Sequence, residues 1–268
     1  MNKLEEAMNR PIGVFDTGIG GMTVLIELEK ILAKEQYIYY ADTKNNPYGD
    51  KSKEEIQELV DKHIAFFKEQ AVKLVVIACN TASVVDIDQL REKYDLPIIT
   101  VIDATLDAIR EEDKNIAVIA TQATIDSNKH KSMILEAFPD KKVYPIAAPR
   151  IAPIIEFENL SDDQAQNIVD DYIFPYRDKE IDSLILACTH FPIWQDHFSK
   201  ALPQADLINP ARNTARKVKD FLIKHDILCN QDKTDTREDI YFVSGDLEVF
   251  KEKLAKIFDK KEKNVRKG

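Results

Sequence analysis

Short apolar runs alternate with polar loops and amphipathic stretches through the first hundred residues. The run IGVF at 12–15 is ended by the segment DTGIGG, and residues 22–32 then carry apolar side chains at helical spacing. The same order of strand, loop and helix recurs, with strands expected at 37–41, 74–78 and 96–100 and helices at 54–70 and 84–94. Alternating strands and helices predict parallel βαβ units whose sheet is covered on both faces.

The pattern restarts in the second half of the chain. Apolar runs at 115–121, 142–148 and 183–187 predict further strands, and a helix is expected at 211–224. The rest of the chain is interpreted as a polar linker at 230–236, a last strand and turn at YFVSGD (241–246), and a solvated terminal helix within 251–268. The chain therefore holds a second set of strands, separate from the first.

Two segments of the pattern are similar to each other. VVIACNT (75–81) and LILACTH (184–190) each consist of an apolar strand followed by a cysteine and polar residues. An internal duplication is the natural inference, although any two buried parallel strands have similar apolar sequences. We expect an α/β fold of two similar domains, each with a central, mostly parallel sheet flanked by helices, and a site in the cleft between them.

Composition narrows the class of protein. The 268 residues are 44% hydrophobic, enough for one large core or two of domain size, and carry a formal net charge of −10. The acidic balance argues against nucleic-acid binding, which needs clustered Lys and Arg. With neither a secretory signal at the N-terminus nor a run long enough to span a membrane, a cytoplasmic protein is expected. Three cysteines, an odd number, speak against a closed disulfide framework.

Four of the seven glycines lie within nine residues at the first strand-to-helix junction: Gly13, Gly18, Gly20 and Gly21. Glycine permits positive φ and a close approach of the backbone to a ligand, and the following helix N-terminus favours an anion. The segment matches neither the GxGxxG dinucleotide fingerprint nor the P-loop. Two interpretations remain, a site for a carboxylate or phosphate and a tight structural turn.

Cys79 and Cys188 directly follow apolar strands, so both are expected at the carboxyl ends of a parallel sheet, where ligands of such folds bind. A single cysteine at a strand end is more often packing than catalysis, but two equivalent ones favour chemistry. A thiol accepts a proton only as thiolate, and His190 and nearby carboxylates are available to tune it. His190 is also interpretable as a helix cap, isolated Glu156 as a solvent-facing acid, and Cys229 as a packing residue.

Four ordered motifs carry a resemblance to the glutamate racemase family of the aspartate/glutamate racemases, along nearly the whole chain. They are FDTGIGG (15–21), ADTKNNPYGDKS (41–52), ACNTAS (78–83) and ACTHFP (187–192). The resemblance implies racemisation of L- and D-glutamate by two cysteines, one removing the α-proton and the other reprotonating the opposite face. It also implies no pyridoxal phosphate or other cofactor, no metal, and a role in supplying D-glutamate to peptidoglycan synthesis.

The resemblance also implies the roles of individual residues. Cys79 and Cys188 match the catalytic pair, with Asp16 beside the first cysteine and His190 with Glu156 beside the second as groups that assist proton transfer. Asp42 matches a further acidic position of less certain duty. Residues matching substrate-binding or site-adjacent positions are Asp16, Thr17, Tyr48, Gly49, Asn80, Thr81, Thr121, Thr124, Thr189 and His190.

Three positions depart from the family pattern. Thr17 stands where Ser is usual and adds a methyl group, and His130 stands where Tyr is frequent. Asn209 replaces a common acid, which puts a helix-capping or ligand role there in doubt. The resemblance places the first domain at 1–99 plus 209–268 and the second at 100–208.

Two other functions compete with glutamate racemisation. An aspartate racemase or related cofactor-free racemase shares the two-cysteine frame. A thiol–metal module using Cys79, Cys188 and His190 is the second, although the sequence lacks the paired C-x-x-C spacing of structural zinc sites. Glutamate is the partner expected, and a homodimer is left open.

The chemistry itself favours two opposed groups. An α-carbon proton is weakly acidic, so an enzyme without a cofactor has to stabilise a developing carbanion with preorganised donors in a site that excludes water. Inversion needs an acid and a base on opposite faces of one carbon. A pair of similar domains facing each other supplies both.

Overall fold

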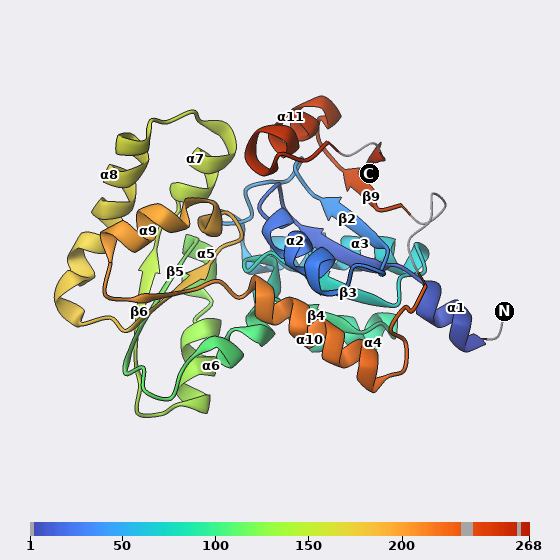
Figure 1. The fold of residues 1–268 in the computed structure, drawn as a ribbon, viewed down its shortest axis with the longest axis horizontal. Coiled ribbons are helices and arrows are strands. Elements are labelled where there is room, and N and C mark those ends of the chain that lie inside the picture. The colour runs from blue at the N-terminus through green and yellow to red at the C-terminus, as the bar shows by residue number, and fades with distance from the viewer. Residues whose placement is uncertain (1–2, 232–237, 262–263) are drawn as a thin grey trace.

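The strands of this computed structural model form two separate parallel sheets, which confirms the expected α/β class (Figure 1). The structure describes residues 3–231, 238–261 and 264–268, so most of the linker predicted at 230–236 lies outside the described residues. We call the part built on the six-stranded sheet the first lobe and the part built on the four-stranded sheet the second lobe. The two lobes lie side by side.

The first sheet has the order β10-β9-β2-β1-β3-β4 and the second the order β6-β5-β7-β8. The strands are β1 (Ile12–Asp16), β2 (Tyr37–Ala41), β3 (Leu74–Ile77), β4 (Ile98–Thr100), β5 (Asn115–Ala120), β6 (Lys142–Ala147), β7 (Ser183–Ala187), β8 (Asp206–Ile208), β9 (Ile240–Val243) and β10 (Val265–Lys267). Every strand pairing between described neighbours is parallel. Buried parallel strands explain the continuous apolar runs in the sequence.

The order of strands repeats between the lobes. In the first lobe β2-β1-β3-β4 lie next to one another, and in the second lobe β6-β5-β7-β8 have the same relative order along the chain. Cys79 comes shortly after β3 and Cys188 directly after β7, the corresponding strand. The two cysteines therefore occupy equivalent places, as the sequence similarity predicts. The domain limits at 99/100 and 208/209 stay a prediction.

Helices cover the sheets, and none in the described part of the chain combines the length and apolar character needed to cross a membrane. The helices are α1 (Lys3–Asn9), α2 (Met22–Ile31), α3 (Lys53–Glu69), α4 (Ile87–Tyr94), α5 (Gln122–Asp126), α6 (Lys129–Ala137), α7 (Ile151–Phe157), α8 (Asp162–Ile173), α9 (Gln195–Ala201), α10 (Ala211–Lys224) and α11 (Leu247–Phe258). Helix α3 begins at a capping box, in which Ser52 and Glu55 satisfy each other's backbone N–H groups.

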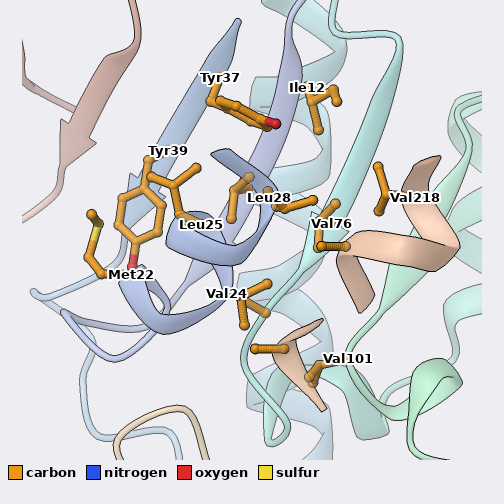
Figure 2. Packing of buried hydrophobic residues seen from close by; sticks show 14 of the residues in the cluster. Ile12, Met22, Val24, Leu25, Leu28, Tyr37, Tyr39, Val76, Val101 and Val218 are labelled. Atoms are coloured by element: carbon orange, nitrogen blue, oxygen red, sulfur yellow. The ribbon is translucent and has the colours of Figure 1, made fainter. Parts of the chain in front are cut away.

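Helices α2 and α10 pack on one face of the first sheet (Figure 2). On α2, Met22, Leu25 and Leu28 recur every three residues and are completely buried, which turns one stripe of the helix toward the strands. Val218 of α10 joins the same cluster, and α3 packs on the opposite face. The helix after the glycine segment is thereby fixed against its sheet, which fixes the segment itself.

The C-terminal segment corrects two expectations. YFVSGD does not hold the last strand, because β10 follows and pairs with β9. Helix α11 is not a solvated tail: Phe250 and Leu254 are almost completely buried in the core of the first lobe. Apolar residues recur three or four positions apart on one face of any amphipathic helix. The sequence pattern alone therefore does not distinguish a helix packed on the core from a helix exposed at the end of the chain.

Two smaller expectations also change. The expected helix at 84–94 begins only at Ile87, after a short 3₁₀ turn at Ala82–Val84. Asn209 does have a capping role, since its Oδ1 accepts a hydrogen bond of 3.0 Å from the backbone N–H of Ala211 at the start of α10. An amide oxygen accepts this bond as a carboxylate would, so the departure from the family acid preserves the cap.

His130, the second departure, is buried in α6 with no hydrogen-bond partner for either ring nitrogen. Burial, with Lys129 as a smaller cause, lowers the pKa of His130 to about 4. The native ring is therefore neutral where an exposed histidine of the unfolded chain would take up a proton. Because the folded pKa lies below the unfolded one, stability is lost as the pH falls from about 6.5 toward 4.

We expect the substitution His130→Phe to remove this loss. Between these two pKa values the wild-type protein should lose roughly 1.4 kcal/mol of unfolding free energy per pH unit more than the variant. Urea unfolding at pH 7.0, 6.0 and 5.0 measures the difference. Parallel pH dependences in the two proteins would show that His130 does not carry this linkage.

Candidate active site

Both predicted cysteines line one narrow pocket, a cavity of about 40 Å³ between the lobes. Cys79 reaches it from the end of β3 and Cys188 from the end of β7, and both are more than nine-tenths buried. The structure thus brings together two residues that are more than a hundred positions apart. The other residues that line the pocket are Thr17, Asn46, Pro47, Tyr48, Gly49, Asp50, Asn80, Thr81, Thr121, Pro149, Ala152, Pro153, Thr189 and His190.

Cys79 lies in a neutral to acidic environment. Its Sγ accepts a hydrogen bond of 3.4 Å from the backbone N–H of Ala82 and lies 3.9 Å from Oγ1 of Thr17. Burial and the nearby carboxylate of Asp16 raise the pKa of the Cys79 thiol well above its usual value. The protonated thiol is therefore the favoured resting form on this side of the pocket. The hydroxyl of Thr17 still reaches the sulfur despite the extra methyl group.

Asp16 ends β1 and is completely buried. Its carboxylate accepts hydrogen bonds from the backbone N–H of Gly18 at 2.9 Å and from Oγ1 of Thr189 at 3.1 Å. Burial raises the pKa of Asp16 to about 6, although His190 and both hydrogen bonds act in the opposite direction. A carboxyl group with this pKa can exchange a proton near neutral pH, which suits a group that assists proton transfer.

Cys188 lies beside a hydrogen-bonded ion pair. His190 Nδ1 is 4.0 Å from Sγ of Cys188, and His190 Nε2 is 2.7 Å from Oε2 of Glu156. Burial alone would lower the pKa of His190, but its bonds to Cys188 and Glu156 raise it well above the usual value. Burial alone would raise the pKa of Glu156, but His190, followed by Lys253, holds it below its ordinary range. The pair is therefore an imidazolium and a carboxylate, and the imidazolium faces the thiol through its other ring nitrogen.

These contacts decide two open interpretations. His190 does begin the short 3₁₀ helix Phe191–Trp194, but its side chain makes no capping hydrogen bond. Glu156 does not point to solvent, because its carboxylate is buried between the lobes. A helix of four residues offers little for a cap to stabilise, and the charge of Glu156 is a much stronger partner.

The glycines at 18 and 20 let the backbone of this segment come close to residues of the second lobe, and neither of them adopts a left-handed backbone conformation. No glycine in the described part of the chain has a positive φ, so the segment uses the other property of glycine, its lack of a Cβ. A Cβ at Gly20 would lie 2.6 Å from His190 Nδ1 and from Thr189 Oγ1, and one at Gly18 would lie 2.6 Å from Glu156 Oε2. The segment therefore packs against the second lobe, beside two carboxylates, which does not support the anion-site interpretation.

A cluster of hydroxyl groups supports the Cys79 side. Thr81 Oγ1 is 2.9 Å from Thr121 Oγ1 and 3.0 Å from Thr124 Oγ1, so the loop after β3 is joined to the N-terminus of α5. Thr121 lines the pocket, whereas Thr124 stands behind it. Asn80 also lines the pocket, and its buried Oδ1 has no hydrogen-bond partner. An unpaired buried acceptor at this place suits a ligand that brings its own donor, such as an ammonium group.

Asp42 lies behind the pocket and not in its lining. Its carboxylate accepts hydrogen bonds from Tyr48 at 2.6 Å and Ser244 at 2.7 Å, and lies 3.0 Å from Nε2 of His63. Although burial opposes it, bonds from His63 and Tyr48 hold the pKa of Asp42 well below its usual range. Asp42 therefore fixes the loop that carries Tyr48 and Gly49. The tyrosine hydroxyl is directed to this carboxylate.

Sequence reasoning missed several contributors. Asn46 donates a hydrogen bond of 3.1 Å to Oε2 of Glu156. It lies within the motif ADTKNNPYGDKS (41–52), and its place in that polar loop was the only sign in the sequence of a role at the site. Lys253 lies on α11, and nothing in the local sequence pointed to it.

Among residues 3–231, 238–261 and 264–268, no three His, Cys, Asp or Glu side chains are grouped as metal ligands would be. Cys79, Cys188 and His190 therefore do not form the ligand set that the thiol–metal alternative requires.

Two equivalent sheets that each direct a thiol into a shared pocket define a racemase-type site. The chain belongs to the Asp/Glu/Hydantoin racemase family, whose model matches residues 12–218. It is 39% identical to glutamate racemase 2 of Caldanaerobacter subterraneus subsp. tengcongensis, over 94% of this chain and 95% of that protein.

Solved structures agree with this assignment. The structure is similar to a glutamate racemase from Francisella tularensis in complex with D-glutamate, with a TM-score of 0.90, 32% identity, and coverage of 97% of this chain and 98% of the other. A glutamate racemase isoform from Bacillus anthracis has the same TM-score at 30% identity, with the same coverage of each chain. The fold and the family resemblance seen in the sequence are thereby confirmed.

The hydrogen bond between the lobes at Asp16 can be tested directly. In Thr189→Val the carboxylate loses a donor, so its pKa should rise from about 6 by about 0.7 pH unit, because a net hydrogen bond contributes about 1 kcal/mol. Thr23→Val is the matched control, because that hydroxyl donates to the carbonyls of Gly20 and Thr189 and not to Asp16. Carboxyl ¹³C NMR of aspartate-labelled protein measures both titrations. An unchanged midpoint in Thr189→Val would contradict the assignment.

Proposed function

We propose that this protein interconverts L- and D-glutamate by proton transfer between two thiols, without pyridoxal phosphate. The observation that carries the proposal is the position of Cys79 and Cys188 at equivalent strand ends of two sheets, on one pocket. The family, the glutamate racemases that share the sequence, and the relative solved with D-glutamate support glutamate as the substrate.

The reaction needs one thiolate and one thiol at a time. The thiolate takes the α-proton, the C–H electron pair remains on the α-carbon, and the opposite thiol gives its proton to the other face. After one turnover the two sulfurs have exchanged protonation states. The reverse reaction, starting from the other enantiomer, restores them, so no group is consumed.

The two thiols have different charged neighbours. Burial and Asp16 favour the protonated thiol of Cys79, whereas His190, held as an imidazolium by Glu156, donates toward the sulfur of Cys188. We assign Asp16 to assist proton transfer at the first cysteine and the His190–Glu156 pair to assist it at the second. Each sulfur therefore has its own polar partner on its side of the pocket.

The substrate's charged groups fit the polar residues of the lining. We assign Asn80 Oδ1 to accept from the ammonium group, and the hydroxyls of Thr17, Thr81 and Thr121 to donate toward the carboxylates, whereas the hydroxyl of Thr189 already donates to Asp16. Preorganised donors of this kind stabilise charge that develops next to the α-carbon. The cavity of about 40 Å³ has room for only a few waters, so we propose that the lobes separate for the substrate to enter.

We further propose that the D-glutamate formed supplies peptidoglycan synthesis and that the protein works in the cytoplasm. Three free cysteines, all buried, support a reducing compartment. A homodimer is compatible with this function but does not follow from the single chain. Aspartate also carries one ammonium group and two carboxylates, so it is the competing substrate.

We expect Cys79→Ala and Cys188→Ala each to lower the rate of racemisation by at least a thousandfold, because each removes one of the two proton carriers. Circular dichroism of glutamate, started separately from each enantiomer, measures the rate. Cys229→Ala is the matched control and should keep its activity, since that thiol is buried away from the pocket. Full activity in either pocket variant would remove the two-thiol hypothesis. Faster racemisation of aspartate than of glutamate by the wild-type protein would transfer the assignment to an aspartate racemase.

A further inference from the structure

Glu156 is held from both lobes at once. It belongs to α7 of the second lobe, where its Oε2 is 2.7 Å from His190 Nε2. Two groups from the first lobe complete its surroundings: Asn46 Nδ2 donates to the same oxygen at 3.1 Å, and Lys253 Nζ donates to the other oxygen, Oε1, at 3.4 Å. Each carboxylate oxygen therefore has its own hydrogen-bond partners, and the partner of Oε1, Lys253, comes from the C-terminal helix α11.

Lys253 is well placed to hold this carboxylate. Only 18% of its side chain is exposed, and Nζ also lies 4.0 Å from the ring centroid of Phe157, the neighbour of Glu156 in α7. Helix α11 is itself fixed, because Phe250 and Leu254 are buried in the first lobe on either side of Lys253 in the sequence. The ammonium group thus reaches across the boundary between the lobes from a helix that is packed on the first lobe.

We infer that Lys253 is a positioning residue for the Cys188 side of the site: it fixes the carboxylate of Glu156, which in turn orients His190 toward the sulfur. This inference rests on the proposed function. Lys253 does not line the pocket and is given no contact with substrate. Its effect passes through Glu156 and His190, so the C-terminal helix takes part in preparing the second thiol only when the lobes are together.

The electrostatics agree with this geometry. Glu156 is faced by His190, Lys253 and the amide of Asn46, while Asp16 and the hydroxyl of Tyr39 lie near enough to interact with it from β1 and β2. Of these, only His190 and Lys253 are cationic. A carboxylate that is buried with one cationic partner removed becomes easier to protonate. A protonated Glu156 no longer stabilises the imidazolium beside Cys188.

The test compares Lys253→Gln with Lys256→Gln, one turn further along the same helix. Lys256 bonds Asn159 in the loop after α7 and does not contact Glu156, which makes it a matched control. We expect Lys253→Gln to lower kcat for glutamate about tenfold with KM changed less than twofold, and to move the acid limb of kcat to higher pH. Lys253→Arg should restore most of kcat and bring the acid limb of its pH dependence back to the wild-type position, because arginine restores the positive charge.

A second measurement does not depend on activity. Carboxyl ¹³C NMR of glutamate-labelled protein, with the Glu156 signal assigned from the spectrum of Glu156→Gln, should show the midpoint of Glu156 rising in Lys253→Gln and unchanged in Lys256→Gln. Circular dichroism and thermal unfolding check that each variant is folded.

The outcomes separate the inference from the proposed function. A wild-type protein that does not racemise glutamate would overturn the proposed function, and the NMR midpoint would still test the contact. If the wild-type protein is active, the inference is overturned when the Glu156 midpoint and the acid limb stay in place in Lys253→Gln. It is overturned equally when Lys256→Gln reproduces the whole effect, because the loss would then reflect packing of α11.

Discussion

The contact between the glycine segment after β1 and the Thr189–His190 segment after β7 is the constraint on which the site depends. A side chain at Gly20 would occupy the space of the His190 ring and the Thr189 hydroxyl. Without one, Thr189 donates to Asp16 across the boundary between the lobes. Both thiols can face a single carbon only while this contact holds, because each is fixed to its own sheet. This contact accounts for Gly18 and Gly20, whereas Gly13 and Gly21 pack against Phe67, Asp16 and Tyr39 of the first lobe.

The two halves of the fold repeat in topology but not in electrostatics. At the end of one sheet, a buried carboxylate near neutral pKa stands beside a protonated thiol; at the end of the other, an imidazolium held by Glu156 stands beside a second thiol. Duplication of the strand order supplies the geometric opposition that inversion needs. The divergence of the surrounding residues gives the two thiols different charged neighbours.

Much of this arrangement follows from the sequence, because buried parallel strands and their loops leave local signals. The apolar runs predicted the main strands, and the position of Cys79 and Cys188 after equivalent runs predicted that they meet. What the sequence could not show are contacts between distant elements. Lys253 reaches Glu156 only because α11 packs on the first lobe, and an amphipathic pattern does not reveal which surface it covers. The environment of His130 depends likewise on packing that no local pattern encodes.

The central claim is that two different groups handle the proton on the two faces of the α-carbon. Racemisation of L-glutamate in D₂O, stopped at low conversion and analysed by mass spectrometry of each separated enantiomer, tests it most directly. Two thiols predict a product that carries one α-deuterium and a remaining substrate that carries almost none, because the donor thiol has exchanged with solvent while the abstracted proton stays on the opposite side. Product that keeps the original α-hydrogen, or deuterium appearing equally in the remaining substrate, would indicate a single base and contradict the account.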